Sequence, residues 1–180
     1  MTKSIIVNDK IFREYISREE LDTIVTRLAV EINRDFAGRR PLFLVMLNGA
    51  FLFAADLLRQ VTVSDEMYFV RCSSYEGLLT TGTVQLHTPI PWQIEERDVI
   101  IIEDIIDTGT TMFYFLEELE KFSPLSVTIV TLLQKPEALQ CRTTIHYCGK
   151  LISNEFVVGY GLDYDGHGRT LDAIYIAGDE

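Results

Sequence analysis

Residues 98–111 read Asp98-Val99-Ile100-Ile101-Ile102-Glu103-Asp104-Ile105-Ile106-Asp107-Thr108-Gly109-Thr110-Thr111, and they carry the clearest signal of secondary structure in the chain. Four successive β-branched residues, Val99 to Ile102, have the continuous apolar character of a strand covered on both faces, as in a parallel sheet. After Thr111, apolar residues recur at helical spacing. They are Met112, Phe115, Leu116 and Leu119. The sequence therefore predicts a buried strand, a short acidic and Thr/Gly-containing loop, and a helix.

The predicted loop lies at the carboxyl end of a strand and the amino end of a helix, where open α/β sheets bind their ligands. Free backbone N–H groups and the positive end of the helix dipole favour a phosphate at this position. Glu103 and Asp104 would repel that phosphate unless sugar hydroxyls or a metal ion lay between them. The stretch thus predicts a ligand with a phosphate, a polyol and a divalent cation.

Other readings of this loop start from the same residues. Strand-end acidic pairs followed by a third carboxylate also occur in receiver-like signalling domains, where Asp107 would be the phosphorylated residue. The Thr-Gly turn can also simply cap a helix. A Walker-type nucleotide site is excluded, because the loop contains no lysine and the chain has no G-x-x-x-x-G-K-[ST] motif.

The rest of the chain alternates strands with helices. Ser17 begins a capping box followed by a helical stripe that ends near Gly38, and Asn48-Gly49 forms a turn between a strand and a second helix. Further strands are predicted at 42–47, 67–72 and 126–133. This order favours an α/β fold with a doubly wound, mostly parallel twisted sheet flanked by helices. We expect one domain over residues 1–180, with a core over about 17–135 and a small hood built from the N-terminal segment and about 136–180.

Three blocks carry a family resemblance. Residues 103–112 are similar to the phosphoribosyl-diphosphate motif of type I phosphoribosyltransferases, most closely to the version in hypoxanthine-guanine phosphoribosyltransferases. Leu132-Leu133-Gln134-Lys135-Pro136 resembles the segment of that family that presents a lysine to the purine. Phe156-Val157-Val158-Gly159-Tyr160-Gly161-Leu162-Asp163-Tyr164, followed by Arg169, resembles its purine-hood and pyrophosphate segment. The likeness runs from about residue 44 to about residue 171.

The resemblance implies purine salvage. The expected reaction joins hypoxanthine, and also guanine, to 5-phospho-α-D-ribose 1-diphosphate (PRPP) and yields IMP or GMP with pyrophosphate. Asp107 would take a proton from the imidazole edge of the purine as general base. Glu103 and Asp104 would hold the ribose hydroxyls, directly or through Mg²⁺. The phosphoribosyl group would be wrapped by Asp107 and the following loop residues, Thr108, Gly109, Thr110 and Thr111.

The same resemblance implies the contacts to the base. Lys135 would donate to the 6-oxo group of the purine and so select against adenine, whose exocyclic amine is itself a donor. Phe156 would stack on the purine ring, and Val157 would offer backbone groups to its edge; an ordinary buried core phenylalanine is the alternative for Phe156. Asp163 is grouped with these purine-binding residues and would also bind a second Mg²⁺ on the pyrophosphate side.

Pyrophosphate would be bound by Arg169 and by the loop that contains Asn48 and Gly49. Residues 73–82, with Ser74 and Tyr75, resemble the mobile loop that closes over the reacting centre. The chain departs from the family pattern at three places. Many relatives have a basic residue where Asn48 stands, and the family more often has lysine or another residue at Thr110. Relatives often have an aromatic residue beside Arg169, whereas here two glycines, Gly166 and Gly168, precede it, so that we expect this arginine to be ordered only with ligand.

Composition agrees with a soluble enzyme. The 180 residues are 47% hydrophobic, and no apolar run reaches the ~18 residues of a membrane helix. A formal charge of −11 argues against attraction to nucleic acid or anionic lipid. The three cysteines, odd in number and without metal-type spacing, predict free thiols in the cytoplasm.

The sequence leaves other activities open. A xanthine- or adenine-preferring phosphoribosyltransferase would have the same motifs, and a phosphoribosyltransferase-like regulator would bind RNA through a basic face. Relatives tend to form homodimers or homotetramers, so the resemblance implies an oligomer.

Overall fold

The computed structural model describes residues 4–64, 66–74 and 84–178. Its main sheet has six strands in the order β5-β4-β3-β6-β7-β8. In chain order these strands are β3 (Leu42–Leu47), β4 (Met67–Ser74), β5 (Val84–Leu86), β6 (Asp98–Ile106), β7 (Ser126–Gln134) and β8 (Tyr147–Leu151). All neighbouring pairs are parallel except β4 and β5. The predicted mostly parallel α/β sheet is confirmed.

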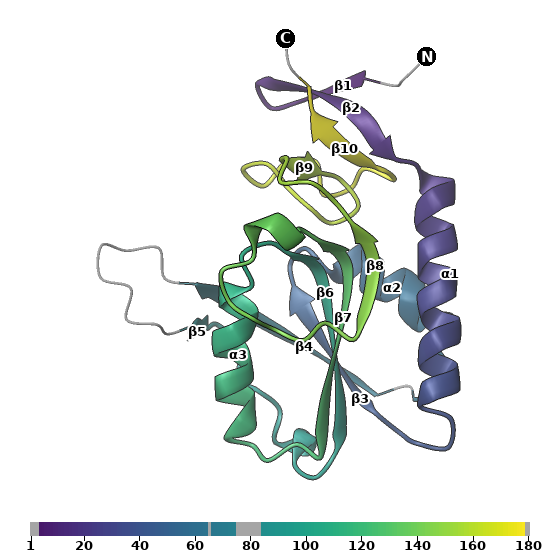
Figure 1. The fold of residues 1–180 in the computed structure, drawn as a ribbon, viewed down its shortest axis with the longest axis vertical. Helices are drawn as coiled ribbons and strands as arrows, with labels where there is room; N and C mark the ends of the chain where they lie inside the picture. Colours follow the sequence, from purple (N-terminus) through teal and green to yellow (C-terminus); the bar gives the residue numbers. More distant parts are fainter. Residues whose placement is uncertain (1–3, 65, 75–83, 179–180) are drawn as a thin grey trace.

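Helices cover both faces of this sheet (Figure 1). On one face, α1 (Arg18–Asp35) and α2 (Phe51–Leu58) pack against a core cluster that includes Phe43, Ile100 and Leu132. On the other face, α3 (Thr110–Glu120) packs against a second cluster. Strands β3, β6 and β7 lie inside the sheet and are buried over most of their lengths, which agrees with the apolar runs in their sequences.

The helix ends follow the sequence signals. The amide of Glu20 donates to Ser17 Oγ at 3.3 Å, so Ser17 caps α1 as predicted. Two short 3₁₀ turns, η1 (Trp92–Ile94) and η2 (Pro136–Ala138), connect β5 to β6 and β7 to the loop before β8. In the described residues, no helix is long and apolar enough to cross a membrane.

A second sheet of four strands lies at one end of the main sheet (Figure 1). Its order is β1 (Ser4–Val7), β2 (Lys10–Ile16), β10 (Ile174–Ala177) and β9 (Val157–Val158), all antiparallel. The two ends of the chain therefore meet in one sheet, which packs around Phe12, Val158 and Tyr175. We call this sheet, with the loops between β9 and β10, the hood.

One part of the predicted hood belongs elsewhere. Strand β8 lies within the segment after residue 136, but it pairs in parallel with β7 and forms an edge of the main sheet. Its sequence, Tyr-Cys-Gly-Lys-Leu, lacks the apolar run of a strand buried on both faces, and its residues are only partly buried. Gly149 in this strand lets α1 come close, since a β-carbon there would lie 2.8 Å from Ile24 Cγ2.

Candidate active site

Three loops meet at one edge of the main sheet. They follow the carboxyl ends of β3, β6 and β7 and carry Gly49, Asp107 and Lys135 respectively. Because these three strands are adjacent and parallel, their carboxyl ends share one edge. The main sheet therefore brings together residues that lie far apart in the sequence.

The loop after β6 has an open helix N-terminus. Gly109 is the N-cap of α3 with a left-handed φ of 76°, and it has no side chain to cap the helix. Thr108 Oγ1 accepts from the amide of Thr110 at 3.3 Å and lies 3.1 Å from its hydroxyl. A small cavity of about 110 Å³ opens here. It is lined by Glu103, Ile105, Ile106, Asp107, Thr108, Gly109, Thr111 and Met112.

Sequence reasoning missed the segment that holds this loop in place. The amides of Gln140 and Cys141 donate to the carbonyl of Thr108 at 2.9 and 3.2 Å. The carbonyl of Cys141 also lies 3.0 Å from where a β-carbon of Gly109 would be. No local sequence pattern predicts these contacts, because they depend on how the chain after β7 passes over the loop.

Glu103 and Asp104 lie side by side at the end of β6 and are partly buried. Burial, together with the adjacent charge of Asp104, holds the pKa of Glu103 well above its usual value. Each carboxylate accepts from the next backbone amide along the chain, at 3.2 Å for Glu103 and 2.9 Å for Asp104. The acidic pair is therefore electrostatically unfavourable and would gain from a cation or hydroxyl donors.

Lys135 and Asp107 form an ion pair at the mouth of the cavity. Lys135 Nζ lies 2.6 Å from Asp107 Oδ2, and the lysine side chain is only 8% exposed against 45% for the aspartate. Lysine is rarely buried without a partner. Lys135 is thus not a surface lysine, and its side chain is fixed beside the carboxylate.

The loop after β3 is packed between the acidic pair and the hood. The peptide bond between Leu47 and Asn48 is cis, and Asn48 is exposed. A β-carbon on Gly49 would lie 1.6 Å from Asp104 Oδ2, and one on Gly161 would lie 1.9 Å from the carbonyl oxygen of Gly49. Only residues without a β-carbon allow these approaches. The sequence motif contains Gly161 but predicts no role for it.

Arg169 is held beside this loop by two contacts within the hood. Its Nη1 donates to the carbonyl of Gly161 at 2.8 Å, and its Nη2 pairs with Asp163 Oδ1 at 2.7 Å. Gly166 and Gly168, which precede the arginine, adopt positive φ angles of 83° and 90° and shape the turn that returns it to the site. Asp163 also accepts from the amide of Gly166.

Phe156 lies on the hood rather than in a core. Its side chain is 45% exposed, and its ring packs edge-on against Tyr164 at 5.6 Å and tilted against Phe12 at 6.2 Å. The buried-core alternative for Phe156 is wrong. Val157 follows in β9, where it pairs with Ile176 of β10.

Some predicted residues are not brought together. Ser74 ends β4, and Tyr75 lies outside the described residues. Asp163 pairs with Arg169 and does not join the two acids of β6: over 4–64, 66–74 and 84–178 no three His, Cys, Asp or Glu side chains are grouped to hold a metal ion. His146 accepts from the amide of Ile129 at 3.0 Å and is thus a satisfied histidine.

A family model supports the sequence resemblance. The model described as "Phosphoribosyl transferase domain" matches residues 17–165. The chain belongs to the phosphoribosyltransferase family. The match covers the three predicted blocks up to Asp163 and includes all three loops of the site, so the resemblance inferred from sequence is confirmed.

Relatives of this phosphoribosyltransferase carry more specific names. It is 38% identical over 165 residues to a "Hypoxanthine-guanine phosphoribosyltransferase" of Streptococcus thermophilus, covering 91% of this chain and 92% of the relative. It is 32% identical over 177 residues to a "Hypoxanthine-guanine-xanthine phosphoribosyltransferase" of Tritrichomonas foetus, covering 98% and 96%. A crystal structure of a hypoxanthine-guanine phosphoribosyltransferase from Bacillus anthracis matches with a TM-score of 0.86 at 36% identity, covering 96% of this chain and 98% of that one.

Some relatives are much longer. The chain is 39% identical over 171 residues to "Bifunctional protein TilS/HprT" of Listeria monocytogenes, covering 94% of this chain but 26% of that protein. The phosphoribosyltransferase thus spans about a quarter of these relatives.

Proposed function

We propose that this phosphoribosyltransferase transfers the phosphoribosyl group of PRPP to hypoxanthine and guanine, and releases pyrophosphate with IMP or GMP. Relatives that match the chain over most of both lengths are named for these two bases. The observation that carries the proposal is the buried Lys135 paired with Asp107 beside an open phosphate cradle.

This pair matches the edge of a 6-oxopurine. The base presents an acceptor, its 6-oxo oxygen, next to an imidazole nitrogen that loses a proton when the neighbouring nitrogen attacks the sugar. The ammonium of Lys135 can only donate, and the carboxylate of Asp107 accepts. Adenine would present its exocyclic amine, itself a donor, to the ammonium of Lys135, and two donors facing each other in a buried site are costly.

The loop after β6 is proposed to bind the 5′-phosphate. Backbone N–H groups of the first turn of α3, including that of Thr110, the helix dipole and the hydroxyls of Thr108 and Thr111 would favour an anion at this position. No acidic residue lies in that first turn. Glu103 and Asp104 then remain for the ribose hydroxyls, which donate hydrogen bonds to carboxylates.

The donor set fits Mg²⁺. Magnesium prefers oxygen ligands and keeps several waters, and it usually binds through one or two carboxylates plus substrate phosphates. Glu103 and Asp104 supply two carboxylates whose mutual repulsion a cation would relieve. When bound, the ion would neutralise charge on the pyrophosphate. A second ion at Asp163 would compete with Arg169 for the carboxylate.

Pyrophosphate is proposed to leave toward Arg169 and the loop at Asn48 and Gly49. Arg169 offers a planar guanidinium suited to phosphate oxygens, already fixed by Asp163 and Gly161. The side chain of Asn48 has no charge, so the loop would act through its backbone. Positive charge develops on the anomeric carbon as the leaving group departs, and Asp107 takes the proton of the incoming base.

The hood is proposed to cover the base. The exposed ring of Phe156 would stack on the purine, and the backbone of Val157 would meet its edge. Xanthine is a second candidate substrate, because the Tritrichomonas foetus relative is named for it.

A competition assay tests the proposal. Rates with hypoxanthine, guanine, xanthine and adenine are measured at saturating PRPP and Mg²⁺. We expect turnover with the first two and none with adenine. Lys135→Met should raise the KM for hypoxanthine by about 10- to 100-fold, the effect of a lost charged hydrogen bond. Lys121→Met, which changes an exposed lysine at the end of α3, is the control. Fast turnover with adenine alone would refute the proposal.

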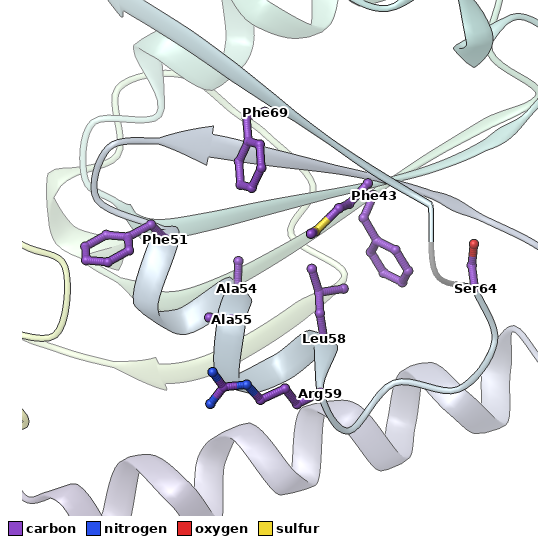
Figure 2. A pocket seen from close by; sticks show the side chains of 9 residues that line it. Phe43, Phe51, Ala54, Ala55, Leu58, Arg59, Ser64 and Phe69 are labelled. Carbon is purple, nitrogen blue, oxygen red and sulfur yellow. The ribbon is translucent and has the colours of Figure 1, made fainter.

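We also propose a homo-oligomer, in the cytoplasm. A cavity of about 390 Å³ lies between α2 and strands β3 and β4 (Figure 2), and Phe51, Met67 and Phe69, which line it, are exposed. A second copy of the chain that covered these residues would bury apolar surface next to the loop at Gly49. The thiols of Cys72, Cys141 and Cys148 are free, which agrees with a reducing compartment.

A further inference from the structure

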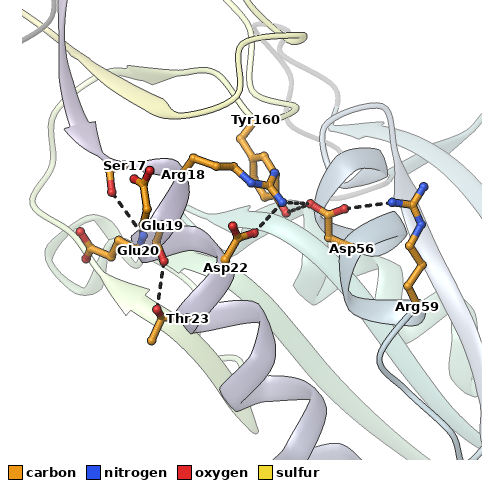
Figure 3. Close-up of polar contacts among 9 residues, drawn as sticks. All are labelled: Ser17, Arg18, Glu19, Glu20, Asp22, Thr23, Asp56, Arg59 and Tyr160. Atoms are coloured by element: carbon orange, nitrogen blue, oxygen red, sulfur yellow. Dashed lines mark hydrogen bonds and ion pairs between the residues drawn. The ribbon is translucent and has the colours of Figure 1, made fainter.

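A partly buried polar cluster joins three separate elements (Figure 3). Asp56 on α2 accepts two hydrogen bonds at Oδ2, from the hydroxyl of Tyr160 at 2.7 Å and from Arg18 Nη2 at 2.8 Å. Arg59 Nη1 lies 3.5 Å from the other oxygen, Oδ1. Arg18 starts α1, and its guanidinium lies 5.3 Å from the centre of the Tyr160 ring. The cluster thus connects the hood to both helices on one face of the main sheet.

Tyr160 depends on this carboxylate. Its side chain is 1% exposed and its backbone has a left-handed φ of 49°, which is rare for a residue with a bulky side chain. A buried phenol needs a partner, and Asp56 supplies a charged one. Burial and the bond to Asp56 raise the pKa of the Tyr160 hydroxyl, so the tyrosine stays protonated and donates.

Tyr160 directly precedes Gly161, the hood residue that packs against the loop at Gly49. Gly161 packs on the carbonyl of Gly49, accepts from Arg169 Nη1, and donates its amide to the carbonyl of Arg169 at 2.9 Å. The loop at Gly49 leads directly into α2, whose later turn carries Asp56. Asp56 is therefore connected to Gly161 in two ways. One connection runs along α2 to Gly49, which contacts Gly161, and the other runs through the hydroxyl of Tyr160, the residue before Gly161.

We propose that Asp56 is a positioning residue for pyrophosphate: through the hydroxyl of Tyr160 it fixes the backbone of Gly161, and with it Arg169 and the loop at Gly49. This inference rests on the proposed function, which places the leaving group between that loop and Arg169. Asp56 touches neither the Lys135 and Asp107 pair nor the cradle after β6. Its effect is thus confined to one half of the site.

Kinetics on a small variant set test this role. Tyr160→Phe removes only the hydroxyl, Asp56→Ala removes the acceptor, and Asp56→Asn keeps an acceptor oxygen. Asp22→Asn is the matched control, because Asp22 pairs with Arg18 at 2.6 Å without contacting Tyr160. We expect Tyr160→Phe and Asp56→Ala to raise the KM for PRPP, and the Kd for pyrophosphate with Mg²⁺ by calorimetry, by about tenfold, the effect of one lost hydrogen bond to a charged group.

The KM for hypoxanthine should change less than twofold in both variants, Asp56→Asn should recover part of the pyrophosphate affinity, and Asp22→Asn should match the wild type. Circular dichroism confirms folding, and Tyr160→Phe carries the test if Asp56→Ala does not fold. Equal rises in both KM values, or wild-type pyrophosphate affinity in Tyr160→Phe, would overturn the positioning role. Absence of turnover by the wild type with any purine would instead overturn the proposed function, and the calorimetry would still decide the role of Asp56.

Discussion

Lys135 Nζ lies 2.6 Å from Asp107 Oδ2, although the two residues follow different strands and are separated by 28 positions. The pair forms because β6 and β7 are parallel neighbours whose carboxyl ends meet, and the amide of Lys135 also donates to the carbonyl of Ile106 at 3.0 Å. When a ligand enters, the ammonium of Lys135 can bind an acceptor of the ligand in place of Asp107, and the carboxylate of Asp107 can bind a donor in place of Lys135. In the proposed function, the pair would receive a base that offers an acceptor and a donor side by side.

Asp107→Asn should lower kcat much more than it weakens PRPP binding. The amide keeps the size of the side chain but cannot take a proton, and general-base contributions are about 10²- to 10⁴-fold. We expect a fall in kcat within this range, while the Kd for PRPP from calorimetry changes less than threefold, roughly the loss expected for a weak exposed contact. Glu117→Gln, on the exposed side of α3, should behave as wild type. An unchanged kcat in Asp107→Asn would show that Asp107 is not the general base.

Gly49→Ala should damage the pyrophosphate side of the site. The new β-carbon would lie 1.6 Å from Asp104 Oδ2, so either the loop or the carboxylate must move. Overpacking of this kind costs about 1 to 3 kcal/mol, and pyrophosphate affinity should fall by about tenfold or more. Gly178→Ala is the control, because its β-carbon would meet only the carbonyl of Ile11 at 3.7 Å. Identical pyrophosphate affinity in the two variants would show that the loop is not part of the site.

Asp56 should contribute stability that disappears in acid. Burial alone would raise the pKa of Asp56, but the hydrogen bond from Tyr160 and the pairs with Arg18 and Arg59 outweigh it and hold the pKa below its usual value of 3.8. The unfolded chain therefore takes up this proton first as the pH falls. The stabilisation is complete above pH 3.8 and is lost as the pH drops through the lower pKa of the folded state.

Urea unfolding of the wild type and Asp56→Asn measures this contribution. At pH 7 the variant should be less stable by about 1 to 2 kcal/mol, the range of a hydrogen-bonded charge that is partly exposed. The difference should shrink as the pH is lowered below 3.8. A difference that stays constant from pH 7 to the acid limit would mean that the carboxylate charge does not stabilise the cluster.

Phe69→Glu should weaken the proposed self-association. Phe69 is 48% exposed and lines the cavity in Figure 2, so a buried charge at that face would be costly. Light scattering after size-exclusion chromatography should show the wild type as an oligomer and the variant shifted toward the monomer. Trp92→Glu, a change at a more exposed aromatic residue in η1, should leave the mass unchanged. A monomeric wild type would end the oligomer proposal.

The sequence predicted most of the main sheet because its signals are local. The apolar runs of β3, β6 and β7, the capping Ser17 and the Gly109 turn each depend on a few neighbouring residues. The family resemblance then assigned the loops between them. Strand β8 was missed because it lies at an edge, where a half-exposed strand needs no apolar run.

Contacts between distant segments were beyond local reasoning. Nothing near Asp56 in the sequence points to Tyr160, and nothing near Gly161 points to Gly49; both contacts appear only when the hood is placed on the main sheet. The pairing of Arg169 with Asp163 was missed for a similar reason, since the positive φ angles of Gly166 and Gly168 fold the segment back on itself.

The approach of Gly161 to the Gly49 carbonyl also constrains protein engineering. A chimaera that takes its hood from one donor and its main sheet from another, as a route to new base specificity, must keep a glycine at position 161. Any other residue there would place a β-carbon 1.9 Å from that oxygen and push the two halves apart. Chimaeras that exchange only the residues around Phe156 leave the contact between Gly161 and Gly49 unchanged.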